Sequence, residues 1–125
     1  DDGIKSENHR IDGVYHTVNP IANDHVKIYK ENTREYTLMK TKHFGDALQM
    51  EVGALMVGKI VNHHEECKVH RGMEKGYFEF GGSTVILAFE KDQIEPDADI
   101  LANWNEGYET VVKLGEGIGT KKKEQ

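Results

Sequence analysis

Short apolar runs separated by turn residues dominate this chain. Gly, Pro, Asn or Asp interrupts these runs roughly every eight to twelve residues, and 13 of the 125 residues are glycine. This spacing is typical of β-strands joined by tight turns, and the apolar side chains do not recur with the period of an α-helix. The sequence therefore predicts a mainly β protein, a single domain with a partly closed or sandwiched antiparallel sheet and little helix.

The apolar runs give the expected positions of the strands. A helix is expected over Asp97–Trp104 because Pro96 stands where a helix commonly begins. The Lys-, Glu- and Gln-rich tail, residues 120–125, is expected to be disordered, which leaves 1–119 as the domain. The predicted strands are Gly13–Val18, His25–Tyr29, Arg34–Thr41, Ala47–Val52, Met56–Val61, Gly76–Phe80, Val85–Phe89 and a less apolar one at Glu109–Leu114.

The charge of the chain argues against a nucleic-acid partner. Lys and Arg number 16 against 22 Asp and Glu, which gives a formal charge of −6, and the basic residues are scattered apart from Lys121–Lys123. The lone Cys67 rules out an internal disulfide. No run approaches the roughly 20 apolar residues that span a bilayer, and no signal segment opens the chain. Because Asp1 is not preceded by Met, we expect an upstream portion that carries any targeting segment.

A glycine-rich break lies between two of the predicted strands, at Gly81-Gly82-Ser83-Thr84. Two adjacent glycines remove the Cβ constraint on φ, so the backbone can bend sharply there. A serine just after such a bend can reach the carbonyl that precedes it. Taken alone, these four residues are explained more simply by a glycine bulge in a hairpin.

Possible metal ligands gather at His63, His64, Cys67 and His70. Their spacing matches no standard zinc site, and adjacent side chains on a strand point to opposite faces. A charged connection between strands accounts for them, so no metal is predicted. His9 and His16 are likewise expected to be surface or strand residues.

Six blocks of the sequence, in this order, resemble the phosphatidylserine decarboxylase family, in particular the branch found in fungal and plant endomembranes and in some bacteria. The similarity extends from about Asp12 to Gly119. The blocks are Gly13–Ala22, Glu31–Arg34, Phe44-Gly45, Val52–Ile60, Arg71–Ile86 and Glu109–Gly115.

The resemblance implies a proenzyme that cuts itself between Gly82 and Ser83. Ser83 would be the catalytic residue and the precursor of a pyruvoyl cofactor, formed through an N-to-O acyl shift. Fragments 1–82 and 83–125 would remain together as a noncovalent pair, and the substrate would be phosphatidylserine, converted to phosphatidylethanolamine. The side chains expected to anchor both cut ends in the core are Phe78, Phe80, Val85, Leu87 and Phe89.

The same resemblance places two groups needed for cleavage before Asp1. In the family, a histidine activates the serine and an aspartate orients that histidine, and both belong to an upstream stretch. We therefore expect this chain to be inert by itself. The family also implies association with a membrane surface, either an endomembrane (Golgi, vacuole or endosome) or a bacterial inner membrane, and leaves a homodimer open.

Two other functions fit the same residues. A pyruvoyl-dependent enzyme could act on a free amino acid, because the chemistry involves only the α-amino acid group. A noncatalytic lipid-binding or scaffold relative is the second alternative, and it would follow if no activating histidine accompanies Ser83 in the protein.

Overall fold

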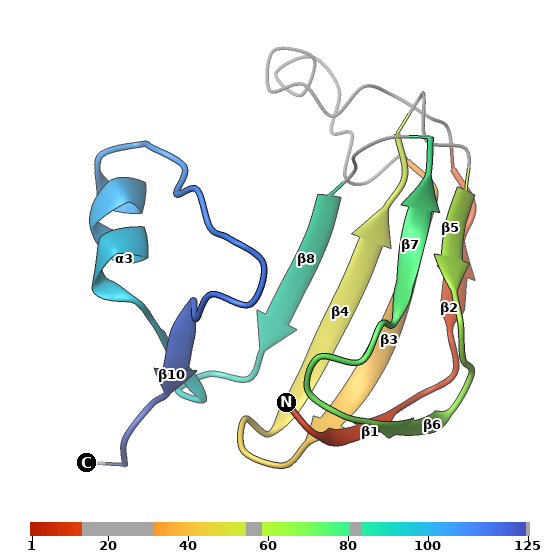
Figure 1. The fold of residues 1–125 in the computed structure, drawn as a ribbon, viewed down its shortest axis with the longest axis horizontal. Coiled ribbons are helices and arrows are strands. Elements are labelled where there is room, and N and C mark those ends of the chain that lie inside the picture. The colour runs from red at the N-terminus through yellow and green to blue at the C-terminus, as the bar shows by residue number, and fades with distance from the viewer. Residues whose placement is uncertain (14–31, 55–58, 81–83, 125) are drawn as a thin grey trace.

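A computed structural model describes residues 1–13, 32–54, 59–80 and 84–124 of the chain (Figure 1). These residues form ten strands and one helix. The elements are β1 (Gly3–Lys5), β2 (His9–Ile11), β3 (Arg34–Thr41), β4 (Asp46–Val52), β5 (Lys59–Asn62), β6 (Cys67–Val69), β7 (Gly76–Glu79), β8 (Thr84–Phe89), β9 (Ile94–Pro96), α3 (Ala98–Asn105) and β10 (Gly119–Lys121).

The main sheet is antiparallel and has the strand order β6-β1-β3-β4-β8, with β2 also paired to β3. Its two longest strands, β3 and β4, pair over seven residues, and β8 pairs with β4 over six. The register puts Glu35, Glu51 and Val85 side by side on one face of the sheet. On the other face of the sheet, Ile86 of β8 lies beside Met50 of β4. This alternation follows from the two-residue period of a strand.

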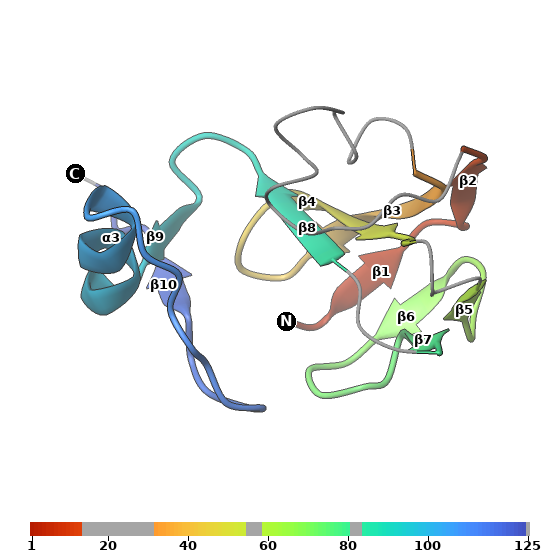
Figure 2. The same ribbon diagram turned by 90° about the horizontal axis from the view of Figure 1, so that it is seen from above.

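A second, two-stranded sheet of β5 and β7 lies against one face of the main sheet (Figure 2). Two polar contacts join the layers. Asn62 on β5 donates to Glu35 on β3 at 2.7 Å, and Lys75, just before β7, donates to Glu51 on β4. The face between the two sheets is therefore partly polar, which fits the predicted sandwich arrangement.

The C-terminal part forms a small arm beside the main sheet (Figures 1 and 2). Strands β9 and β10 pair in it, and α3 follows β9. Gly107, at φ +82°, ends the helix in a Schellman motif, in which the Gly107 N–H donates to Trp104 O and the Tyr108 N–H donates to Asn103 O. A glycine suits this position because other residues rarely adopt positive φ.

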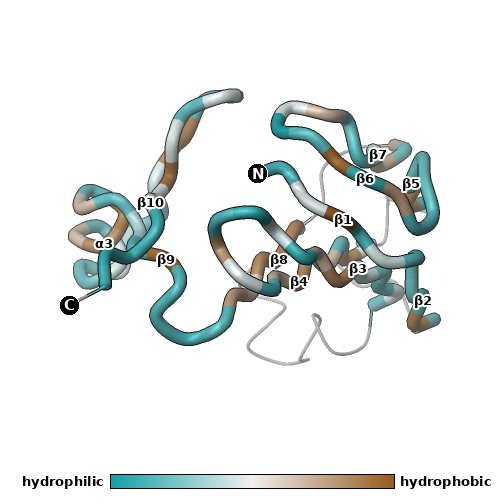
Figure 3. Tube along the Cα trace, turned by 90° about the horizontal axis from the view of Figure 1, so that it is seen from below, coloured by the Kyte–Doolittle hydropathy of each residue, from teal (hydrophilic) through white to brown (hydrophobic). Residues whose placement is uncertain are grey.

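Few apolar side chains are buried in this fold. Among the described residues, the buried apolar ones are Ala47, Val52, Ala54 and Ile60, whereas sixteen large apolar residues are exposed. Figure 3 shows hydrophobic residues along β4 and β8. The described chain thus has a small apolar core and leaves much apolar surface bare.

The mainly β fold and its antiparallel pairing are confirmed. The predicted strand Arg34–Thr41 coincides with β3, and the predicted helix is α3 shifted by one residue. The predicted strands Gly13–Val18 and His25–Tyr29 lie wholly or almost wholly outside the described residues, as does the first part of Met56–Val61.

Three predictions are wrong. Glu109–Leu114 is not a strand, because the chain there runs on from the helix cap to a turn without a paired neighbour strand. Residues 120–121 pair with β9, so disorder from Thr120 onward does not hold for them. Three of the five expected core side chains, Phe80, Val85 and Leu87, are exposed.

Candidate functional site

The connection between β7 and β8 joins the two sheets. Glu79 at the end of β7 pairs with Lys59 on β5, and Thr84 at the start of β8 pairs with Val52 on β4. The chain therefore leaves one sheet and enters the other within a few residues. Gly81, Gly82 and Ser83 themselves lie outside the described residues, so their predicted roles stay predictions.

Phe80, the last described residue before this connection, has an unusual backbone. Its φ is +66°, in the left-handed region that bulky residues rarely adopt. Such a conformation costs about 1–3 kcal/mol and is often found at functional sites. The Phe80 side chain is also 81% exposed. No burial of the ring offsets the backbone strain.

The predicted anchoring of both flanking segments by core side chains is wrong in part. Phe80 is exposed, and Val85 and Leu87 are 49% and 47% exposed. Phe78 and Phe89 are half-buried, and Phe89 contacts Phe44 edge to face. Val85 and Leu87 lie on β8, the last strand of the main sheet, and the described residues include no further strand beside it. Backbone pairing to β5 and β4 holds the two segments instead.

Sequence blocks that are far apart in the chain meet beside the start of β8. Next to Val52, the Gly53 N–H donates to Thr33 O at 2.8 Å, and the buried Asn32 amide donates to Gly53 O. The Gly13 N–H donates to Thr33 Oγ1 at 3.1 Å. Asn32 and Thr33 are almost fully buried. This shell of hydrogen bonds fixes the end of β4, and therefore the position of Thr84 opposite it.

A buried polar network surrounds Glu51, which precedes Val52 on β4 and pairs with Glu35 on β3. The Lys75 ammonium donates to Glu51 and also to Asn62 Oδ1 at 2.5 Å, and Asn62 donates to Glu35. Arg10 lies 3.7 Å from the other oxygen of Glu35. Within the described residues, the second oxygen of Glu51 is buried and accepts no hydrogen bond. The network ties β2, β3, β4, β5 and the start of β7 together.

Lys5 on β1 is a second buried charge, only 1% exposed. Its ammonium donates to His64 O at 2.6 Å, to Glu65 O at 2.8 Å, and to Ser6 O and Asn8 Oδ1. Burial lowers the pKa of Lys5, and the positive charge of Lys75 lowers it further. These acceptors make Lys5 a link between the β1–β2 turn and the β5–β6 turn.

The histidine-rich segment makes separate polar contacts. His63 Nε2 lies 2.8 Å from Glu74, and His70 lies 3.9 Å from Asp2. In the part of the chain that the structure describes, no group of three His, Cys, Asp or Glu residues could hold a metal ion.

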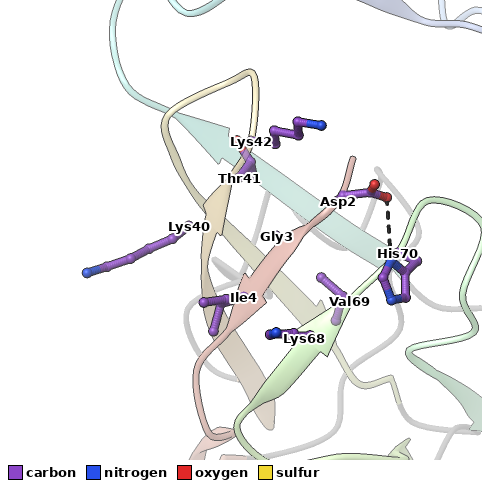
Figure 4. A pocket seen from close by; sticks show the side chains of 9 residues that line it. All are labelled: Asp2, Gly3, Ile4, Lys40, Thr41, Lys42, Lys68, Val69 and His70. Atoms are coloured by element: carbon purple, nitrogen blue, oxygen red, sulfur yellow. Dashed lines mark ion pairs between the residues drawn. The ribbon is translucent and has the colours of Figure 1, made fainter.

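A shallow groove of about 350 Å³ lies over Gly3, between Thr41 and Val69 on the flanking strands (Figure 4). Asp2 borders it and accepts a hydrogen bond from the Arg71 N–H, which lowers the pKa of Asp2. Figure 1 shows the N-terminus at the opposite end of the sheet from the start of β8. The groove is therefore not part of the candidate cleavage site.

Comparison with known proteins shows which family these features belong to. The family profile for phosphatidylserine decarboxylase matches residues 1–120. Similar curated proteins are phosphatidylserine decarboxylase proenzymes, with 52% identity over 123 residues in Clostridium botulinum (strain Eklund 17B / Type B) and 48% over 125 residues in Desulfitobacterium hafniense (strain Y51). The chain therefore belongs to the phosphatidylserine decarboxylase family.

The match covers 97% and 98% of this chain but 42% of each of these two relatives. The chain thus spans less than half the length of the curated relatives it matches. These relatives are bacterial, so the comparison supports the bacterial side of the family and not the expected fungal and plant endomembrane branch. No solved structure matches the chain. No helix in the described residues is long and apolar enough to cross a membrane.

Sequence reasoning missed the two buried lysine clusters. Glu51 gave one available signal, because it is the single charged residue in the predicted strand Ala47–Val52. Lys75 and Lys5 lie in polar stretches where nothing in the local pattern distinguishes a buried lysine from an exposed one. Their burial depends on carbonyl and carboxylate oxygens from distant segments.

Proposed function

We propose that this chain carries the self-cleavage site of a phosphatidylserine decarboxylase, at the Gly82–Ser83 bond. The mature protein would comprise a fragment of residues 1–82 and a fragment of residues 83–125, with a pyruvoyl group in place of Ser83. The observation that carries the proposal is the passage of the chain from one sheet to the other between β7 and β8. Each new chain end would stay paired to a different neighbouring strand.

The cleavage begins at the Ser83 hydroxyl. Its Oγ attacks the carbonyl carbon of Gly82, the C–N bond breaks, and the Gly82 acyl group passes to Oγ as an ester. Loss of the Ser83 Cα proton expels the Gly82 carboxylate and leaves dehydroalanine. Water then hydrolyses the tautomeric form of this residue, releases ammonia and leaves the ketone of the pyruvoyl group.

The described residues on both sides of the bond fit this chemistry. The left-handed backbone of Phe80 turns the chain at the end of β7, and the shell around Gly53 fixes the start of β8. When formed, the pyruvoyl group supplies an electron-withdrawing ketone that accepts the electrons left by loss of CO₂. The lipid substrate further requires that the site approach a membrane surface.

A chimera tests the proposal, since the resemblance places the activating histidine and its aspartate before Asp1. In it, this chain replaces the matched part of the C. botulinum relative. We expect the purified chimera to release CO₂ from phosphatidylserine vesicles, and Ser83→Ala to abolish the release. Ser6→Ala is the matched control, because it also removes one serine hydroxyl, on the β1–β2 turn beside Leu38 on β3, and it should leave CO₂ release unchanged.

The substrate comparison separates the alternatives. Release of CO₂ from free amino acids but not from phosphatidylserine vesicles would contradict the lipid substrate and favour the amino-acid enzyme. A folded chimera that binds the vesicles and never releases CO₂ would contradict the enzyme and favour a scaffold.

A further inference from the structure

Strand β8 ends the main sheet, yet it lacks the features that protect an edge strand. Its sequence, Thr84–Phe89, is TVILAF and contains no charged residue and no proline. Natural edge strands are usually short, charged or interrupted, because a free row of backbone N–H and C=O groups pairs readily with other chains. The described part of the structure contains no strand on the outer side of β8.

Both faces of β8 are apolar and bare. Val85 and Leu87 point to one face and are 49% and 47% exposed, and Ile86, on the other face, is 36% exposed. Uninterrupted apolar runs are typical of strands that are covered on both faces, whereas a strand with one wet face alternates apolar and polar residues. The composition of β8 therefore belongs to an interior strand.

The exposed apolar side chains of the described residues lead to the same conclusion. Sixteen large apolar residues among those described are exposed, whereas the four buried apolar residues include two alanines. The relatives carry more than half of their length outside the matched region, which is enough polypeptide to cover this surface.

Two other coverings fit β8 less well. A lipid surface could cover one face but cannot pair with the free backbone edge. A second copy could pair β8 with β8, but each face would then gain another bare Val85, Ile86 and Leu87 from the copy, which enlarges the exposed apolar strip. Of these three coverings, only a different polypeptide segment fills the edge that the described strands leave open and also covers both faces.

We propose that a further strand pairs with the free edge of β8. This strand comes from a polypeptide segment that corresponds to the part of the proenzyme relatives outside the matched region, and it is supplied on the same chain or on a separate one. That segment also packs on the two apolar faces. The inference concerns assembly, and it holds or fails independently of cleavage at Ser83.

Amide hydrogen exchange tests this directly, because only alternate N–H groups of an antiparallel edge strand point toward its partner. In this chain alone, alternate amides of β8 should exchange rapidly. In the chimera carrying Ser83→Ala, every amide from Val85 to Phe89 should be slowed, the outward ones on the order of ten-fold or more. Leu87→Lys should restore rapid exchange, while Ile11→Lys on β2, where Ile11 is 38% exposed, should not.

Three results would overturn the proposal. The alternating pattern could persist in the folded chimera, this chain alone could protect all β8 amides as a monomer or as a dimer, or phosphatidylserine vesicles alone could protect them. The C. botulinum relative provides a second measurement that does not depend on chimera folding. Its segment matching β8 should show continuous protection, and an alternating pattern there would contradict the proposal equally.

Discussion

Lys75 donates a hydrogen bond to the carboxylate of Glu51 and thereby joins the start of β7 to the strand that holds β8. The two side chains are only 13% and 9% exposed. Because Glu51 on β4 pairs with Val85, this ion pair links the two sheets beside the start of β8. Its removal should therefore affect the assembly of the two layers.

Replacing Lys75 with Met should destabilise the fold strongly. The substitution leaves the buried Glu51 carboxylate without its cation, and loss of one partner of a buried pair typically costs about 3–5 kcal/mol. Urea unfolding followed by far-UV circular dichroism measures the change. The exposed pair of Lys59 and Glu79, 3.7 Å apart, is the control, and Lys59→Met should cost at most about 1 kcal/mol. Equal effects of the two substitutions would contradict the buried role of Lys75.

Gly76→Ala should weaken the pairing of β5 with β7. A Cβ at Gly76 would lie 2.0 Å from the backbone oxygen of Val61, so the two strands must separate. Overpacking of this kind costs about 1–3 kcal/mol. Gly117→Ala serves as the control because a Cβ there meets no atom within 4 Å, and its unfolding free energy should change by no more than about 0.5 kcal/mol. A neutral Gly76→Ala would show that the strands do not approach this closely.

The long strands could be predicted from the sequence because their own residues favour strand structure. Arg34–Thr41 was assigned to its full length, and the β4 and β8 predictions missed one residue at their starts. The five three-residue strands, β1, β2, β6, β9 and β10, were missed. They have no apolar run of their own, and pairing with a neighbour defines them.

The candidate site could be predicted only as a sequence motif. The Gly-Gly-Ser-Thr break pointed to a bend, but pairing of its flanks in two different sheets depends on β4 and β5, which precede it in the chain. The burial of Lys5 was also out of reach, because the oxygens that satisfy it come from residues 64 and 65. The core anchors were mispredicted because apolar composition does not reveal whether a covering element is present.

Glu65→Gln should change how stability depends on pH. The Asn8 N–H, donating to Glu65 at 3.0 Å, lowers the pKa of this carboxyl below its usual 4.5. A lowered pKa means that the carboxylate stabilises the folded state well above pH 4.5 and loses that contribution as the pH falls through the folded-state pKa. The difference in unfolding free energy between wild type and variant should therefore be constant near neutral pH and shrink in acid. A difference that grows in acid would contradict the contact.

Intact-mass spectrometry of the purified chimera tests the central claim most directly. We predict two species, one ending at Gly82 and one starting at position 83, the latter lighter than its serine-containing sequence by the mass of one ammonia. Ser83→Ala should give one uncut chain. A folded chimera that remains uncut, or that splits at any other bond, would contradict the account.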